Sequence, residues 1–137
     1  MSKSKTKVVH ISGKRKSAIA RATVKEGNGK VIINGVPIDL FSNNFYNNRI
    51  KEAVLLSDEL ASKVNITVKV MGGGVAGQAE AVRLAIARGL LEYSNSEDLK
   101  QTYLNYDRQL LIADIRRKET RKPNRSKARA KRQKSYR

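Results

Sequence analysis

The most informative segment of this chain for its architecture is residues 66–88, I-T-V-K-V-M-G-G-G-V-A-G-Q-A-E-A-V-R-L-A-I-A-R. Its first five residues alternate apolar and polar side chains, which predicts a half-buried strand. Beyond the glycines, Val82, Ile86, Leu90 and Tyr93 recur at helical spacing and predict a helix with one stripe in the core. The glycines between them permit a left-handed backbone and a close approach of two chain segments. We therefore expect a strand, a tight glycine turn and a buried helix.

The same glycines raise the question of a nucleotide cofactor. Gly72, Gly74 and Gly77 match the G-x-G-x-x-G spacing of a dinucleotide-binding turn. That fold needs a second parallel strand after the helix, ending in an acid about 20 residues beyond the loop. Glu97 and Asp98 lie at that distance, but S-N-S-E-D-L is typical of a helix start. We therefore expect no cofactor, no small-molecule substrate and no enzymatic activity.

The segments before the glycine turn predict further strands. Strands are indicated over residues 7–12 and 18–25 by β-branched composition and by alternation. A G-N-G turn at residues 27–29 leads to residues 30–34, which we interpret as the return strand of a hairpin with 18–25. An antiparallel ribbon is expected here.

The remaining elements complete an α+β fold. Residues 42–44, S-N-N, are candidate N-caps of a helix through residues 46–56. Ser94 or Ser96 starts a further helix through residues 99–106, and residues 112–115 read as a short strand. The order predicts a single mixed β-sheet of about four strands with helices packed on it, rather than a repeated βαβ unit.

The charge is concentrated at the two ends of the chain. The formal net charge is +17, from 29 Lys and Arg against 12 Asp and Glu. Residues 1–16 hold six basic residues and no acid, residues 116–137 hold twelve and one acid, and residues 17–115 hold eleven of each. We predict a basic N-terminal arm with a first short strand (1–16), a globular α+β domain (17–115) and a basic extended C-terminal tail (116–137). Pro123 disfavours a continuous helix through the tail.

Cationic extensions on a neutral body indicate a polyanionic partner, and nucleic acid is the common one. A membrane is disfavoured because neither end carries the apolar face of an interfacial helix, and no stretch is long and apolar enough to span one. Without cysteine, and with His10 as the one histidine, neither a metal cluster nor a His-containing triad is expected. We expect a cytoplasmic location, since no secretory signal is evident.

Four ordered segments resemble one known family, the universal small-subunit ribosomal protein number nine. They are G-K-R-K-S-A-I-A-R-A (13–22), G-G-G-V-A-G-Q-A-E-A-V-R-L-A-I-A-R-G-L (72–90), D-I-R-R-K-E-T-R-K-P (114–123) and the terminal K-S-Y-R (134–137). The ending Q-K-S-Y-R is similar to the archaeal and eukaryotic type, whereas the bacterial form ends in Ser-Lys-Arg.

The resemblance implies a left-handed β-α-β crossover and a place in the head of the small ribosomal subunit, beside neighbouring head proteins. It also implies contacts with ribosomal RNA (rRNA) and, at the tail tip, with the tRNA in the peptidyl site. Carried over residue by residue, rRNA binding falls on Lys14, Arg15, Lys16, Gly72, Gly73, Gly74, Arg116, Arg117, Arg121, Lys122, Arg125, Lys127 and Arg129. The tRNA contact falls on Lys134, Ser135, Tyr136 and Arg137.

Two alternatives remain open on the residues alone. The chain is also compatible with a free-standing, nonspecific RNA- or DNA-binding protein, in which Phe41, Phe45 and Tyr46 form a base-stacking platform, although such a cluster is more often core. The loop at residues 72–74 either packs against backbone or offers the free N–H groups of a helix N-terminus to phosphate.

Overall fold

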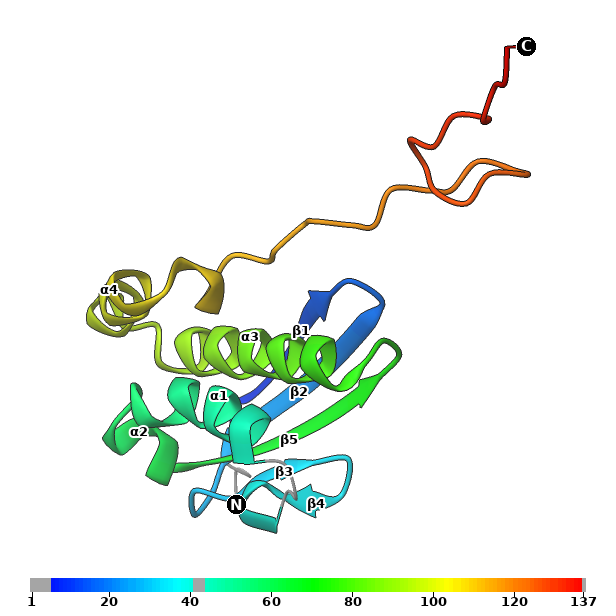
Figure 1. The fold of residues 1–137 in the computed structure, drawn as a ribbon. Coiled ribbons are helices and arrows are strands. Elements are labelled where there is room, and N and C mark those ends of the chain that lie inside the picture. Colours follow the sequence, from blue (N-terminus) through cyan, green and yellow to red (C-terminus); the bar gives the residue numbers. More distant parts are fainter. Residues whose placement is uncertain (1–5, 41–43, 137) are drawn as a thin grey trace.

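A computed structural model describes residues 6–40 and 44–136 of the chain and has one sheet with helices on one of its faces (Figure 1). The predicted α+β class with a single mixed sheet is confirmed, with five strands in place of about four. The strands are β1 (Val8–Arg15), β2 (Ala18–Glu26), β3 (Val31–Ile33), β4 (Val36–Pro37) and β5 (Val64–Met71). The helices are α1 (Asn44–Leu55), α2 (Glu59–Ser62), α3 (Val75–Ser94) and α4 (Glu97–Tyr106), with 3-10 turns η1 (Ile38–Leu40) and η2 (Arg108–Leu110).

The sheet order is β1-β2-β5-β3-β4, so the predicted hairpin between β2 and β3 is wrong. β5 lies between them, antiparallel to β2 and parallel to β3. The reason lies in the G-N-G turn, whose amides bond to the beginning of β5 rather than closing a two-strand loop. Gly27 N donates to Lys63 O at 3.0 Å and Gly29 N to Val64 O at 3.1 Å. The chain thus crosses past β5 before β3 begins.

β1 and β2 form the antiparallel ribbon that the sequence indicates, in register from Val8–Lys25 to Arg15–Ala18. The parallel strands β3 and β5 are joined through α1 and α2, which makes a β-α-β crossover. Its left-handedness stays a prediction. Residues Ser42 and Asn43, candidate N-caps of α1, lie outside the described residues, and Asn44 is the first residue of α1 rather than its cap.

The core lies between the sheet and α3. The predicted stripe is confirmed for Val82, Ile86 and Leu90, which are buried, while Tyr93 is partly buried at the helix end. Small residues bring helix and sheet together: a Cβ on Gly89 would lie 2.8 Å from Val24 Cγ2. α3 therefore packs against β1, β2 and β5 at a distance that larger side chains would not permit.

α4 begins as the sequence predicts, because Ser96 is its N-cap and accepts from Leu99 N at 3.4 Å. Tyr103 is fully buried and its Oη donates to Ala53 O at 2.7 Å, which ties α4 to α1. Tyr106, by contrast, is exposed.

The strand predicted at residues 112–115 is wrong. The chain there follows η2 as an irregular segment that pairs with no strand in the described part of the chain. Leu110 is fully buried, and Arg88 Nε donates to Leu111 O at 2.8 Å. A side chain of α3 therefore holds this segment where a sheet neighbour was expected.

Candidate nucleic-acid interface

The basic turn between β1 and β2 carries three of the predicted rRNA-binding residues. Lys14 and Arg15 are the last residues of β1, so they belong to the sheet rather than to a free arm, and Lys16 follows with a left-handed φ of 51°. The side chains of Lys14 and Lys16 are exposed. The Arg15 side chain is only 13 % exposed. Two of the three cations therefore face solvent.

The glycine loop lies directly against this turn. Gly72 has a left-handed φ of 77°, and a Cβ there would lie 2.5 Å from Ser17 O. A Cβ on Gly73 would lie 3.0 Å from Ala18 N. Backbone packing thus explains both glycines. Gly74 differs, because it is the N-cap of α3, gives that helix no side-chain cap, and has open space around it.

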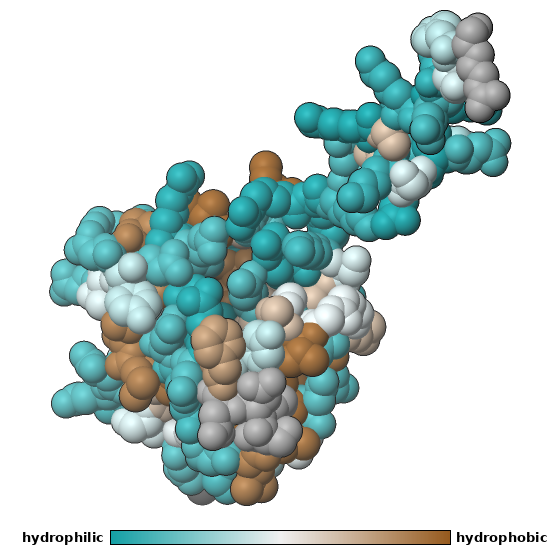
Figure 2. Space-filling view, viewed as in Figure 1, coloured by the Kyte–Doolittle hydropathy of each residue, from teal (hydrophilic) through white to brown (hydrophobic). Residues whose placement is uncertain are grey.

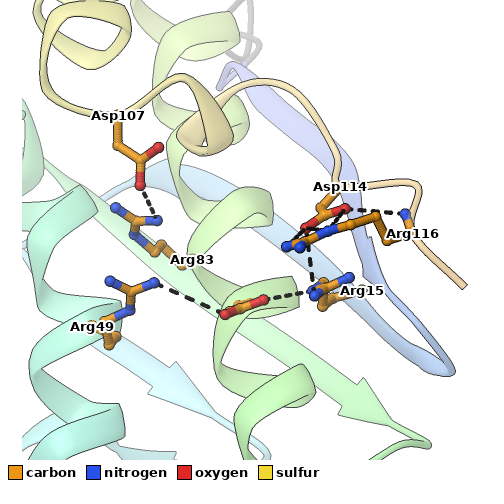
Figure 3. Close-up of polar contacts among 7 residues, drawn as sticks. Arg15, Arg49, Arg83, Asp107, Asp114 and Arg116 are labelled. Carbon is orange, nitrogen blue, oxygen red and sulfur yellow. Dashed lines mark hydrogen bonds and ion pairs between the residues drawn. The ribbon is translucent and has the colours of Figure 1, made fainter.

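The tail leaves the body at the same place through a cluster that we call the tail junction, comprising Arg15, Glu80, Asp114, Arg116 and Arg117. Figure 3 shows Arg15, Asp114 and Arg116 of this cluster. The Asp114 carboxylate accepts from the Arg116 side chain, at 2.6 Å from Nη2, and from its backbone N–H at 3.0 Å. These bonds hold the pKa of Asp114 well below its ordinary range. Arg117 Nη1 donates to the carbonyl oxygen of Lys16, which fastens the tail to the β1–β2 turn.

Arg15 connects the tail junction to α3. Its Nε donates to Glu80 Oε2 at 2.7 Å, and its Nη2 lies 3.4 Å from Asp114 Oδ2. Arg49 of α1 lies 3.9 Å from the other Glu80 oxygen. The charges of Arg15 and Arg116 are thus engaged within the protein, so both guanidinium groups position the root of the tail.

A second buried ion group, which the sequence analysis missed, lies next to the tail junction. Arg83 of α3 is 3 % exposed, and its Nη1 donates to Asp107 Oδ2 at 3.0 Å. Its Nη2 lies 2.7 Å from Glu52 Oε2, a close contact without hydrogen-bond alignment. Burial raises the pKa of Asp107, but the hydrogen bonds from the Gln109 N–H and from Arg83 lower it by a larger amount. The pKa of Asp107 therefore lies below its ordinary value. Arg83 thus joins α1, α3 and η2, and no local pattern indicated these partners.

Beyond the tail junction the tail extends away from the body without a helix or strand up to residue 136, and Figure 2 shows it as mostly hydrophilic. Its internal contacts are few and exposed, such as Arg129 Nε to Glu119 Oε2 at 3.1 Å, and such pairs stabilise little. The predicted tRNA-binding tip is exposed at Lys134, Ser135 and Tyr136, while Arg137 lies outside the described residues. The cations of the tail up to residue 136, Arg121, Lys122, Arg125 and Lys127 among them, face solvent.

The described residues give little support for a base-stacking platform, a metal site or a membrane-spanning helix. Phe45 is exposed and Tyr46 is partly buried, with ring centroids 5.3 Å apart in an edge-on pair, and Phe41 lies outside the described residues. Within ranges 6–40 and 44–136 no group of three or more His, Cys, Asp or Glu side chains could hold a metal ion. None of the helices described is long and apolar enough to cross a membrane.

Comparisons with known proteins agree with the resemblance found in the sequence. Residues 13–137 match the family described as ribosomal protein S9/S16. The small ribosomal subunit protein uS9 of Methanothrix thermoacetophila is 51% identical over 131 residues, covering 96% of this chain and 99% of that protein. The protein of the same name from Methanococcus maripaludis is 46% identical over 133 residues, with the same shares covered. This chain therefore belongs to the ribosomal protein S9/S16 family.

Proposed function

We propose that this protein is a structural component of the small ribosomal subunit whose tail tip contacts the tRNA in the peptidyl site. The observation that carries the proposal is the tail junction. It brings the basic turn, the glycine loop and the root of the tail to one end of the molecule, from which a segment with twelve basic residues and one acid departs. Its place in the subunit head and its contacts with neighbouring head proteins belong to the same proposal.

Binding to rRNA follows from charge and shape rather than from sequence readout. Lys14, Lys16 and the exposed cations between Arg121 and Arg129 neutralise phosphates and release counterions. Arg15, Arg116 and Arg117 act through the tail junction by setting the direction in which the tail leaves the body. Phosphate at the open N-terminus of α3, beside Gly74, is compatible with the packing of Gly72 and Gly73.

The tip is suited to a backbone contact at a distance from the body. A chain of 22 residues spans at most roughly 70 to 80 Å, so the tail can cross an RNA domain. Tyr136 is 88% exposed and can stack on a base or donate to a phosphate, and Lys134 and Arg137 supply charge.

The first experiment compares ribosomes that carry the full chain with ribosomes whose chain lacks residues 134–137. The deletion removes two basic residues, so the matched control is Lys131→Gln with Arg132→Gln, which removes two charges without shortening the tail. Small-subunit assembly and tRNA affinity at the peptidyl site are measured for each. We expect normal assembly in both and weakened tRNA binding with the deletion alone. Failed assembly, or unchanged tRNA affinity, would contradict the proposed contact between the tail tip and the tRNA.

Co-sedimentation tests the rRNA part of the proposal against the free-standing polycation. Both bind RNA at low salt, but a generic polycation spreads over all RNA and is removed as salt rises. We expect the full chain to remain with purified small subunits after a high-salt wash. Its release, with equal binding to unrelated RNA, would support the free-standing nucleic-acid-binding protein instead.

A further inference from the structure

The sheet has a second face that the described helices leave uncovered. Residues of β1, β2 and β5 that alternate with the buried ones point away from α1 and α3, which lie on the other side (Figure 1). On these three strands the outward positions are Val8, His10, Ser12, Lys14, Ile19, Arg21, Thr23, Lys25, Asn65, Thr67, Lys69 and Met71. Four of these residues are Lys or Arg and none is Asp or Glu. We call this surface the open sheet face.

Two cations are placed side by side at its centre. Arg21 on β2 is directly opposite Lys69 on β5 and, on its other side, opposite Ser12 on β1. Like charges directly opposite each other across two strands are destabilising. Neither cation forms an ion pair within the described part of the chain. The free protein therefore carries an uncompensated charge repulsion at this position.

The acids that balance the body lie elsewhere. Residues 17–115 contain as many acids as bases, yet five of the eight cations off the open sheet face pair with acids, whereas Arg21, Lys25 and Lys69 on it pair with none in the described residues. Lys51 lies 2.9 Å from Asp39, and Lys100 lies 3.1 Å from Glu97. This distribution of charge leaves the open sheet face positive, although the body as a whole is neutral. A positive face is complementary in charge to a polyanion.

The chemistry of the face matches a phosphate backbone. A shallow hollow of about 440 Å³ runs across its centre and is lined by His10, Ser12, Arg21, Thr67 and Lys69, among others. These side chains are cations and hydrogen-bonding groups, the types that contact phosphate and sugar. We propose that the open sheet face, centred on Arg21 and Lys69, binds the sugar–phosphate backbone of folded RNA, as a second contact that shares only Lys14 with the turn and is separate from the glycine loop and the tail. The inference goes beyond the proposed function but shares its RNA partner.

The test removes the two central charges from the full chain. The variant Arg21→Gln with Lys69→Gln is compared with a matched control, Lys63→Gln with Lys100→Gln, whose lysines pair with acids on the helices. Affinity for transcribed small-subunit rRNA is measured as a function of salt. We expect the first variant to bind about tenfold more weakly near 0.1 M salt, with a log–log salt slope reduced by about two. The salt slope of the control should differ from the wild-type slope by less than about half the change expected for the first variant.

The outcomes separate this inference from the proposed function. If the wild-type chain itself fails to bind rRNA specifically, the proposed function fails. If the wild-type chain binds and the two variants have equal slopes, the open sheet face does not bind RNA. Acylation of lysines in assembled subunits adds a third readout: protection of Lys69 together with an unchanged slope on rRNA would show that a protein covers the face, which also overturns the inference.

A single charge reversal distinguishes a loss of RNA binding from a loss of folding. Lys69→Glu places a carboxylate opposite Arg21, so we expect the free protein to unfold at a higher temperature while its affinity for rRNA falls. Opposite changes in stability and affinity would support a face whose repulsion is relieved by RNA. Retained wild-type affinity in Lys69→Glu would overturn the inference.

Discussion

Two glycines with the same backbone conformation differ in what surrounds them. Gly72 and Gly35 have φ of 77° and 81°, but a Cβ on Gly72 would lie 2.5 Å from Ser17 O, whereas one on Gly35 would meet nothing within 4 Å. The left-handed conformation disfavours a side chain equally at both positions. Close backbone packing is required only at Gly72, where the glycine loop touches the β1–β2 turn.

The pair of substitutions Gly72→Ala and Gly35→Ala measures that packing. We expect Gly35→Ala to lower the free energy of unfolding by about 1 kcal/mol, from backbone strain alone. Gly72→Ala should cost about 2 to 4 kcal/mol, because the loop and the turn must also separate. Urea unfolding of both variants gives the two values. Equal decreases in the free energy of unfolding would show that the glycine loop accommodates the new side chain without moving the β1–β2 turn.

Tyr103 gives a prediction for alkaline pH. Burial raises the pKa of its hydroxyl well above the ordinary value of 10.0, more than a hydrogen bond with Ser57 lowers it. A raised folded-state pKa contributes stability that is fully present below the unfolded pKa and is lost as pH rises through the folded one. We therefore expect the free energy of unfolding to fall with pH above about 10. Denaturant titrations across this range measure the decline.

The matched variant is Tyr103→Phe. It removes the bond to Ala53 O and should cost about 1 to 2 kcal/mol at neutral pH. Above pH 10 its stability should fall less steeply than that of the wild type. Parallel declines would mean that folding does not raise the pKa of Tyr103.

At the scale of elements, the tail junction decides how an irregular segment is attached to a sheet. The segment after η2 joins no strand and is held by side chains. Arg88 bonds to Leu111 O near its start. Farther along, Asp114, which also holds Arg116, contacts Arg15, and Arg117 bonds to Lys16 O. These contacts engage the β1–β2 turn and α3, two elements that also hold the glycine loop. The direction of the tail is therefore set by side chains rather than by a strand ladder.

Asp114→Asn should release the root of the tail without unfolding the body. The amide keeps the size of the side chain but loses the charge that holds Arg15 and Arg116. We expect trypsin to cleave after Arg116 several-fold faster, while the unfolding midpoint of the body changes little. Glu119→Gln breaks an exposed pair farther along the tail and should leave this cleavage rate unchanged. Equal rates in wild type and Asp114→Asn would contradict the role of the junction.

At the scale of the whole molecule, folding and the proposed RNA binding depend on different charges. The surplus of basic residues lies outside residues 17–115, where acids and bases are equal in number. Repulsion summed over the folded body is therefore small, although Arg21 and Lys69 repel each other locally, and the proposed attraction to a polyanion comes from the ends and the open sheet face.

This separation predicts two different responses to salt. Between 0.05 and 0.5 M KCl we expect the unfolding midpoint of the free protein to move by only a few degrees. Over the same range the affinity for rRNA should fall by orders of magnitude. Calorimetry and filter binding on one preparation compare the two. A midpoint that rises steeply with salt would show that the body itself is destabilised by repulsion.

Much of the site was predictable because its signals are local. The basic turn, the glycine loop, the Ser96 cap and the charged tail are each read from neighbouring residues. The partners of Arg15 and Arg83 were not predictable, because Asp114 and Asp107 lie far along the chain and nothing nearby marks them as partners. The assignment of individual residues to rRNA and tRNA stays a prediction.

The α+β class, the strand–glycine–helix unit and the segregation of charge could be predicted from the amino-acid sequence, since they depend on short-range periodicity and composition. Three features became visible only in the folded chain: β5 lies between β2 and β3, residues 112–115 form no strand, and the described helices leave one basic sheet face uncovered. Strand order depends on which distant segments bury their apolar faces together, and alternation within one strand specifies a face but not a neighbour.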